Sequence, residues 1–349
     1  MAVLAVVSVA CIAAAQIPPK TFKHIIIVIQ ENRTPDNLFG GAPQKGSCTG
    51  EDPFEPGVDI ANGGYTINNG QRIQICDIQQ PMNTGPIFDP GHFYLAGNLY
   101  GNIGPGNYFG IGAIGELSPG TNGWTYSDLA NFNPTVGYSP LAPPVFDAQG
   151  NLYGTTRDGG ITQPKCWTAF GCGVIFKMTP TSDGSWTYDI LHHFASHATD
   201  GQTPTSGLLM DNSGILYGAT GLGGVYNQGT VFKFALTNGR WKKTVLYDFP
   251  NCSIGCYPGG AMAFDKAGNL YGIADGGIVG HGCGGYTCGV VFRLAPLQNG
   301  CWKYNVMHRF IGSDGAFPLG VVIDDRGHLF GTTQAGGTYN AGVAFEITQ

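Results

Sequence analysis

The residues with the clearest chemical potential lie near the start of the chain, where Glu31 and Asn32 follow an apolar run. Residues 22–30 read FKHIIIVIQ, and this run of β-branched side chains predicts a buried β-strand. Enzymes with α/β folds present polar active-site residues at the carboxyl end of such strands. Neighbouring carboxylate and amide oxygens are suitable ligands for a divalent cation. Glu31 and Asn32 are therefore candidate metal ligands, and capping of a turn is the alternative role for the pair.

The ten cysteines include several close pairs along the sequence. The candidate disulfides are Cys166 with Cys172, Cys283 with Cys288, Cys252 with Cys256 and Cys48 with Cys76, and Cys301 is the alternative partner for the third pair. The first two pairs lie at matching places, just before the predicted strands at Gly173 and Gly289, which favours loop-closing disulfides in an oxidising compartment. A zinc site is the alternative, but the pairs are distant from one another and no histidine spacing supports tetrahedral ligation.

Three histidines, His192, His193 and His197, cluster near the end of a predicted strand. Histidines so close together could serve acid–base chemistry or metal binding. No acidic partner is indicated for them by the sequence. We therefore expect histidines of a surface loop.

Two further residue types recur at fixed places and also admit a chemical interpretation. The aspartates are Asp147, Asp211, Asp265 and Asp324, and the tryptophans are Trp124, Trp186, Trp241 and Trp302. The aspartates could bind calcium, but each lacks the neighbouring carboxylates of a calcium loop, so a role in turns is expected. The tryptophans could stack on sugars if exposed, but their equal register favours packing between neighbouring units.

The overall composition narrows the class of protein. The chain has 349 residues, of which 57 are glycine, yet 42% are hydrophobic and 12% aromatic. This apolar content argues against disorder, so the glycines are expected in turns between many short strands. Charged residues make up only 11%, the net charge is −6, and no basic cluster is present, which argues against nucleic-acid binding.

The elements that must position these residues form a tandem repeat. The sequence GNLYG occurs at 97–101, 150–154 and 268–272, and looser copies occur at 214–218 and 327–331. An interval of about 50 to 65 residues between copies is typical of one supersecondary unit that is repeated and stacked.

Each repeat unit is predicted to contain four short antiparallel strands. In the copy at 201–249, residues 207–210 and 215–218 flank an Asp–Gly turn and form a hairpin, a third strand begins at Gly229, and a fourth extends from Trp241 to Phe249. Four strands per unit are the pattern of a β-propeller blade, so we predict an all-β, propeller-like array of about five four-stranded blades. The fifth copy lacks the Trp–Phe strand. Residues 65–78 are the candidate to complete it, and the alternative is an array that stays open.

Two family resemblances follow from these motifs. The succession of D-x-x-G-N-L-Y-G, Gly-Gly, G-x-V-F-K and W…F over residues 85–349 resembles the GloVer tandem repeats of secreted bacterial proteins, which implies a propeller-like fold and an extracellular setting. The N-terminal sequence KHIIIVIQENRTPDNLFG, with DPGHFY at 89–94, resembles the opening of the bacterial phosphoesterase family of phospholipase C and acid phosphatase type. That resemblance implies an α/β, alkaline-phosphatase-like fragment in which Glu31 and Asn32 bind the catalytic metal. The later motifs of that family do not follow, because the chain after Tyr94 is repeat.

The first fifteen residues are small and apolar and end in Ala-Ala-Ala, as in a secretory signal peptide, and they are too few for a membrane span of about 20 residues. We therefore expect a signal peptide at 1–15, a phosphoesterase-like fragment at 16–84 and propeller repeats at 85–349.

The predicted function is a secreted, non-catalytic binding or surface module for an extracellular glycan or protein, with no cofactor and no nucleic-acid partner. The alternative function is a metal-dependent hydrolase of phosphate esters, which would need a divalent metal at Glu31 and Asn32.

Overall fold

A computed structural model describes residues 65–68, 71–74, 87–88, 93–95, 98–104, 112–120, 123–162, 166, 169–197, 199–277, 283 and 287–348. Every helix or strand assigned within these ranges is a β-strand, so the described part of the chain is all-β, as predicted. Residues 1–64 lie outside this description.

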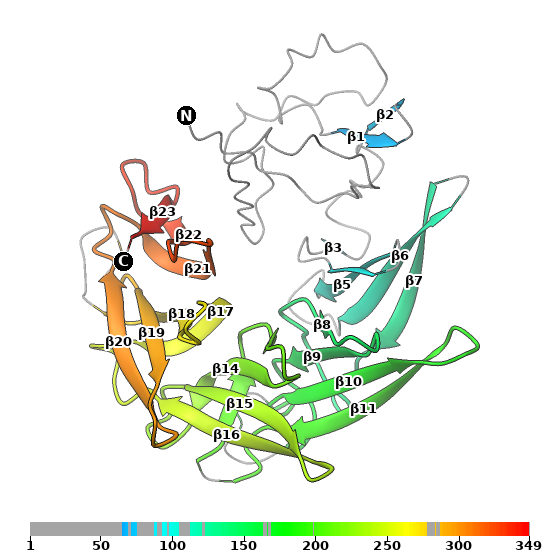
Figure 1. Cartoon of the computed structure of the whole chain (residues 1–349), viewed down its shortest axis with the longest axis horizontal. Coiled ribbons are helices and arrows are strands. Elements are labelled where there is room, and N and C mark those ends of the chain that lie inside the picture. Colours follow the sequence, from blue (N-terminus) through cyan, green and yellow to red (C-terminus); the bar gives the residue numbers. More distant parts are fainter. Residues whose placement is uncertain are drawn as a thin grey trace.

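The strands from β3 onward form five consecutive units, here called blades 1 to 5, and the last two of these units are joined in one seven-stranded sheet (Figure 1). Blade 1 contains β3 (Ile87–Phe88), β4 (Phe93–Leu95), β5 (Asn98–Gly104), β6 (Ala113–Gly120) and β7 (Gly123–Asn131). Blade 2 contains β8 (Val145–Phe146), β9 (Leu152–Thr156), β10 (Val174–Pro180) and β11 (Trp186–His193). Blade 3 contains β12 (Gly201–Pro204), β13 (Leu209–Met210), β14 (Leu216–Gly223), β15 (Thr230–Thr237) and β16 (Arg240–Asp248). Blade 4 contains β17 (Cys256–Phe264), β18 (Leu270–Asp275), β19 (Val290–Pro296) and β20 (Trp302–Arg309), and blade 5 contains β21 (Ala316–Ile323), β22 (Leu329–Ala335) and β23 (Ala344–Ile347).

Within a blade the strands follow one another as an antiparallel meander, and we call them the inner, second, third and outer strand. The inner strand is interrupted in blades 1 and 3, where β3 with β4 and β12 with β13 each pair with a single second strand. The outer strands β7, β11, β16 and β20 lie at the periphery, and the blades follow in chain order around a common centre (Figure 1). This is the arrangement of a β-propeller.

In the described part of the chain, blade 5 has no outer strand, as the missing Trp–Phe segment predicts. It has an inner, a second and a third strand, and among the described residues β23 pairs only with β22. The proposed completing segment instead forms a separate hairpin of β1 (Tyr65–Asn68) and β2 (Gln71–Gln74), which pair with each other. Pairing across a two-residue connection has a small loop-closure entropy, whereas pairing with the far end of the chain has a larger one. Among the described residues, the segment proposed to complete blade 5 therefore does not pair with it, which agrees with the alternative of an open array.

The turn between the inner and second strands is built by the recurring aspartate, as predicted. Asp147 accepts hydrogen bonds from the backbone N–H of Gln149 (3.0 Å) and Asn151 (2.8 Å) and from the hydroxyl of Tyr153 (3.1 Å). Gly150 has a φ of 81°, which favours glycine. Equivalent backbone bonds occur at Asp211, Asp265 and Asp324.

The apolar core lies between neighbouring blades. One cluster combines Tyr217 and Val231 of blade 3 with Leu270 and Phe292 of blade 4. The recurring tryptophans join these interfaces, because the ring of Trp186 lies 6.1 Å from Tyr100, that of Trp241 lies 5.9 Å from Tyr153, and that of Trp302 lies 6.5 Å from Tyr217, each in the preceding blade. Packing between blades is thus confirmed for three tryptophans, and the side chain of Trp124 lies outside the described part.

A second set of contacts between blades is made by a recurring motif that the sequence analysis did not identify. The motif G-x-x-P opens the inner strands at 137–140, 201–204, 255–258 and 315–318. Its third residue has a positive φ in all four copies, at Ser139, Thr203, Tyr257 and Phe317. The N–H groups of Thr203, Tyr257 and Phe317 donate 2.8 Å hydrogen bonds to the carbonyls of Cys172, Gln228 and Cys288 in the preceding blade.

The proline of this motif packs against the glycine that precedes the third strand of the blade before it. A Cβ atom on Gly173, Gly229 or Gly289 would lie 2.6, 2.6 or 2.4 Å from the Cδ atom of Pro204, Pro258 or Pro318. The glycine and the proline therefore set how closely neighbouring blades approach.

Candidate functional site

The loops of one face of the array are tied to one another. In a meander, the loop between the second and third strands emerges on the same side as the connection from the outer strand to the next blade. Backbone hydrogen bonds join these two kinds of loop four times, from Gly160 N to Pro134 O (2.9 Å), Gly224 N to Asp200 O (2.9 Å), Gly277 N to Cys252 O (2.7 Å) and Gly337 N to Gly312 O (2.9 Å). We call this side the loop face.

All three disulfides of the described residues lie on the loop face. They join Cys166 to Cys172, Cys252 to Cys256 and Cys283 to Cys288, with Cα–Cα distances of 5.0, 4.7 and 5.5 Å. The three predicted local pairs are confirmed, whereas the alternative pairing with Cys301 is wrong, because Cys301 is a free, exposed thiol. Cys48 and Cys76 lie outside the described residues. Three disulfides indicate an oxidising compartment.

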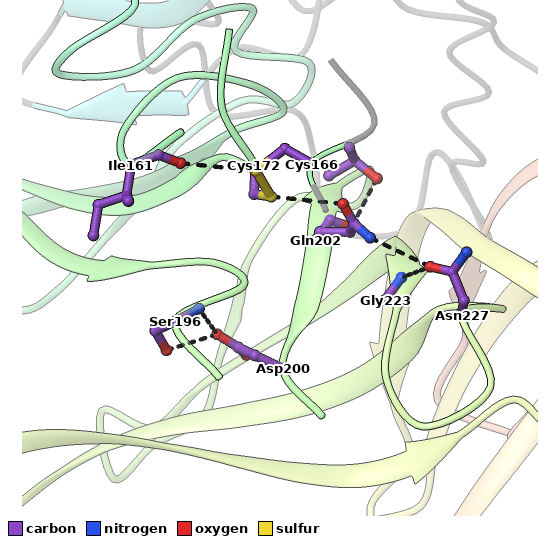
Figure 2. Close-up of a disulfide and its surroundings, with 9 residues drawn as sticks. Ile161, Cys166, Cys172, Ser196, Asp200, Gln202, Gly223 and Asn227 are labelled. Carbon is purple, nitrogen blue, oxygen red and sulfur yellow. Dashed lines mark hydrogen bonds between the residues drawn. A yellow bond between two sulfur atoms is a disulfide. The ribbon is translucent and has the colours of Figure 1, made fainter. Parts of the chain in front are cut away.

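The Cys166–Cys172 disulfide is linked to the loop of the next blade (Figure 2). The Cys172 sulfur lies 3.5 Å from Oε1 of Gln202, and the amide nitrogen of Gln202 donates to Oδ1 of Asn227 (3.3 Å). The same oxygen accepts the N–H of Gly223 (3.1 Å). The loop face is therefore held by bridges both within and between blades.

Removal of one bridge gives the first testable expectation. Replacing both Cys252 and Cys256 by serine should lower the free energy of unfolding by about 2 kcal/mol, because a short closed loop is released in the unfolded chain. Urea unfolding of the oxidised protein measures this loss. Cys301→Ser is the matched control and should leave the unfolding midpoint unchanged, and equal midpoints for all three proteins would contradict a stabilising bridge.

An open hollow of about 230 Å³ lies where blades 2, 3 and 4 meet. Its lining residues are Arg157, Thr203, Thr205, Gly221, Leu222 and Tyr257. The side chain of Arg157 is 40% exposed, as is the residue Tyr257, and the guanidinium of Arg157 lies 3.7 Å from the buried carboxylate of Asp158. The hollow thus offers a positive charge, hydroxyl groups and an aromatic ring to a ligand.

Two lining residues of the hollow have a backbone that is fixed by the hydrogen bonds of the G-x-x-P motif to the preceding blade. Thr203 and Tyr257 are third residues of the G-x-x-P motif, with φ values of 52° and 50°. A non-glycine residue rarely adopts this conformation, and such strain concentrates at ligand sites. The hydroxyl of Thr205 also donates to the carbonyl of Pro258 in the next blade (2.6 Å). The hollow is therefore built on a rigid frame.

The histidine cluster corrects the expectation of a loop without an acidic partner. Asp200 is almost fully buried, and one of its oxygens lies 3.0 Å from Nε2 of His192 and accepts the hydroxyl of Ser196 (3.0 Å). Its other oxygen binds Lys243 of the next blade, whose ammonium group also lies over the rings of Phe194 and Phe232. The sequence analysis did not identify this partner, because Asp200 lies eight residues after His192, beyond the end of the predicted strand.

The charges of this cluster are strongly coupled. Burial by itself raises the pKa of Asp200, but the hydrogen bond from His192 and the positive charge of Lys243 outweigh it and hold the pKa well below its usual range. Burial lowers the pKa of Lys243, and Asp200 opposes that change. Burial, and then the nearby His192, lower the pKa of His193, while His197 is exposed as expected.

In blade 3 the ion pair of Asp200 and Lys243 joins the outer strand to the preceding connection, and blades 2 and 4 make the corresponding contact with a tyrosine hydroxyl. Lys243 stands where blades 2 and 4 have Tyr188 and Tyr304, whose hydroxyls donate to the carbonyls of Val136 (2.7 Å) and Ile254 (2.6 Å) in the preceding connection. Asp200 lies in the corresponding connection before blade 3. We therefore interpret Asp200 and Lys243 as an inter-blade clasp.

The sequence-predicted metal ligands Glu31 and Asn32 lie outside the described residues, as do the predicted signal peptide and most of the predicted N-terminal fragment. Within the described ranges, no three histidine, cysteine, aspartate or glutamate side chains gather closely enough to hold a metal ion. The same ranges contain no helix with the length and apolar character needed to cross a membrane.

The fold and the loop face define a propeller-like repeat protein. The chain belongs to the Gloeobacter/Verrucomicrobia repeat family, whose profile matches residues 65–283 and 165–349. The match begins 20 residues before the predicted boundary at 85 and so includes the β1–β2 hairpin. No curated protein matches the sequence.

Several solved structures share a general likeness with the chain. An α-L-arabinanase of Penicillium chrysogenum is 13% identical, with a TM-score of 0.40 over 74% of this chain and 80% of that one. An endo-arabinase of Bacteroides thetaiotaomicron is 12% identical, with a TM-score of 0.40 over 77% and 96% of the two chains. A β-fructofuranosidase of Bombyx mori is 14% identical, with a TM-score of 0.41 over 72% and 57%.

Proposed function

We propose that this chain is an extracellular, non-catalytic binding module that takes up a glycan or protein ligand on its loop face. The observation that carries the proposal is the hollow between blades 2, 3 and 4, in which Arg157, Thr203 and Tyr257 converge from three blades. A concave surface with a few polar groups and an aromatic ring is the usual form of a ligand site.

The rigidity of the hollow supports binding in particular. Thr203 and Tyr257 are held by inter-blade hydrogen bonds of 2.8 Å, and Cys256, next to Tyr257, is disulfide-bonded. A site that is ordered before the ligand arrives loses less conformational entropy on binding. The extracellular setting is supported by the three disulfides, which require an oxidising environment.

A binding screen tests this function. Labelled full-length chain is applied to glycan and peptide arrays, and any hit is titrated by calorimetry. Tyr257→Ala is expected to weaken saturable binding about tenfold, since an aromatic contact at the centre of a site commonly contributes more than about 1 kcal/mol. Arg157→Gln is the second variant, with a similar loss expected if the ligand is anionic or hydroxyl-rich.

Leu236→Ala is the matched control for that screen. Leu236 is 58% exposed at the end of β15, at the hairpin that leads to the outer strand, on the side away from the loop face. Its truncation should leave affinity unchanged. A ligand that binds the wild type and both hollow variants equally would refute the hollow as the site, and the absence of any saturable ligand would refute the binding function.

The rival function rests on the sequence of the N-terminal region, where Glu31 and Asn32 follow the apolar run at 22–30. If that region forms a phosphoesterase site, purified protein should hydrolyse a chromogenic phosphodiester when a divalent metal is added, and Glu31→Ala should abolish turnover. Turnover of this kind would overturn the non-catalytic assignment.

A further inference from the structure

The loops between second and third strands share one backbone frame in blades 2 to 5. In each, the N–H of the last glycine donates to the carbonyl of the first glycine. The four bonds are Gly173 to Gly159 (3.0 Å), Gly229 to Gly223 (3.2 Å), Gly289 to Gly276 (2.8 Å) and Gly342 to Gly336 (3.2 Å). The frame is constant, whereas the residues inside it differ between blades.

Blades 3 and 5 place nearly the same sequence inside this frame. Residues 223–229 read GGVYNQG and residues 336–342 read GGTYNAG. Asn227 and Asn340 have φ values of 54° and 51°. Their Oδ1 atoms accept the N–H of Gly223 (3.1 Å) and Gly336 (2.8 Å), which fixes each loop from inside.

Both loops hold a tyrosine in solvent. Tyr226 is 55% exposed and Tyr339 is 91% exposed, and each precedes the asparagine that fixes its loop. Blades 2 and 4 have a disulfide in the same frame, so each framed loop is closed by either a covalent bond or an asparagine. An exposed ring on an ordered loop provides a large contact area with little entropy to lose on binding.

We propose that Tyr226 and Tyr339 are two equivalent contact sites for a neutral polysaccharide, each stacking its ring on the C–H face of a sugar. Neither loop contains a charged residue, and the Asp248 carboxylate, which accepts the N–H of Val225 (3.0 Å), disfavours an anionic ligand, so both observations fit an uncharged one. Amide and hydroxyl groups flank each ring, since Asn227 and Gln228 follow Tyr226, and Thr338 and Asn340 flank Tyr339. Such groups can hydrogen-bond sugar hydroxyls while the ring covers the apolar face.

Two copies of one contact on the same face suit a repeating ligand. A polysaccharide presents the same unit many times, so one chain can engage both tyrosines, and the second contact then forms at a high effective concentration. The inference rests on the proposed binding function but not on the hollow, because neither loop contributes a lining residue to it.

The test uses the full chain with a panel of soluble neutral glucans, xylans and mannans, measured by affinity electrophoresis and calorimetry. Tyr226→Ala and Tyr339→Ala should each weaken binding severalfold, and the double variant should weaken it by more than about tenfold because avidity is lost. Tyr226→Phe with Tyr339→Phe keeps both rings and should retain most of the affinity. Thermal unfolding should be unchanged in all of these variants, since both side chains are exposed.

The outcomes separate this inference from the proposed function. Equal polysaccharide affinity for wild type and double alanine variant would overturn the tyrosine sites, while loss on Tyr257→Ala in the same assay would leave the hollow as the binding site. Saturable binding to a peptide together with no binding to any polysaccharide would overturn the inference and keep the binding function. No binding in either format would overturn both.

Discussion

Gly229→Ala should destabilise the protein by about 3 kcal/mol or more. A Cβ atom at this position would lie 2.4 Å from the carbonyl oxygen of Thr220 and 2.6 Å from Cδ of Pro258, and both neighbours are held in β-strands. Overpacking of a rigid site costs about 1–3 kcal/mol. The φ of 92° adds strain of about 1–2 kcal/mol for any residue with a side chain. The two effects act together because blades 3 and 4 cannot separate without losing the bond from Tyr257 N to Gln228 O.

The matched control is Gly214→Ala. Gly214 also has a positive φ, 75°, but a Cβ atom there would meet nothing within 4 Å. Only the backbone strain applies, so a loss of about 1–2 kcal/mol is expected. Urea unfolding followed by tryptophan fluorescence compares the two variants. If they unfold at the same midpoint, the close approach of glycine and proline does not determine how the blades pack.

Asp200→Asn should cost about 3–5 kcal/mol of unfolding free energy. The substitution keeps the shape of the side chain but leaves the ammonium group of Lys243 buried without its counter-charge, and breaking one side of a buried pair has a cost of this size. Both side chains are almost fully buried, with exposures of 0% for Asp200 and 5% for Lys243. The double variant Asp200→Leu with Lys243→Met should lose less than the sum of its single variants, because no uncompensated charge remains.

Asp314 provides the control for the clasp. It also pairs with a histidine, His308, at 2.9 Å, but both side chains are 37% exposed. Asp314→Asn should therefore cost no more than about 1 kcal/mol. Equal losses for Asp200→Asn and Asp314→Asn would show that burial of the clasp contributes nothing.

The clasp also predicts a pH dependence with a definite sign. The pKa of Asp200 is depressed in the folded state, so its contribution is fully present above the unfolded pKa of about 3.9 and is lost as the pH falls from there toward the folded pKa. The difference in unfolding free energy between wild type and Asp200→Asn should thus be constant near neutral pH and shrink below about pH 4. A difference that stayed constant from neutral pH down to about pH 2 would contradict a contribution from the charge of Asp200.

Local features of this fold could be predicted from the sequence because they depend on residues close together in the chain. The Asp147 turn, the three disulfides and the equal spacing of Trp186, Trp241 and Trp302 all follow from patterns within one repeat unit. Even the inter-blade role of the tryptophans could be inferred, since a residue in identical register in each unit meets the same neighbour.

Other contacts between two blades were not predicted. The contact of Pro258 with Gly229 joins residues from two units, and neither carries a sign of its partner in the local sequence. The Asp200–Lys243 clasp is harder still, because it occurs once and breaks the repeat pattern instead of following it. The hollow follows from how three blades are placed in space, so no periodicity indicates it, although the recurrence of G-x-x-P could have identified Thr203 and Tyr257.

The shared frame of the loops has a consequence for how this surface can vary. One glycine-to-glycine hydrogen bond closes the long, disulfide-containing insert of blade 2 and the short Tyr-Asn insert of blade 3 alike. The same bond occurs in blades 4 and 5, so the frame is constant in four blades although the inserts differ in length and sequence. We therefore expect that the residues between the two glycines of one loop can be exchanged for those of another. Such an exchange would change the surface that a ligand meets and would keep the flanking strands in place.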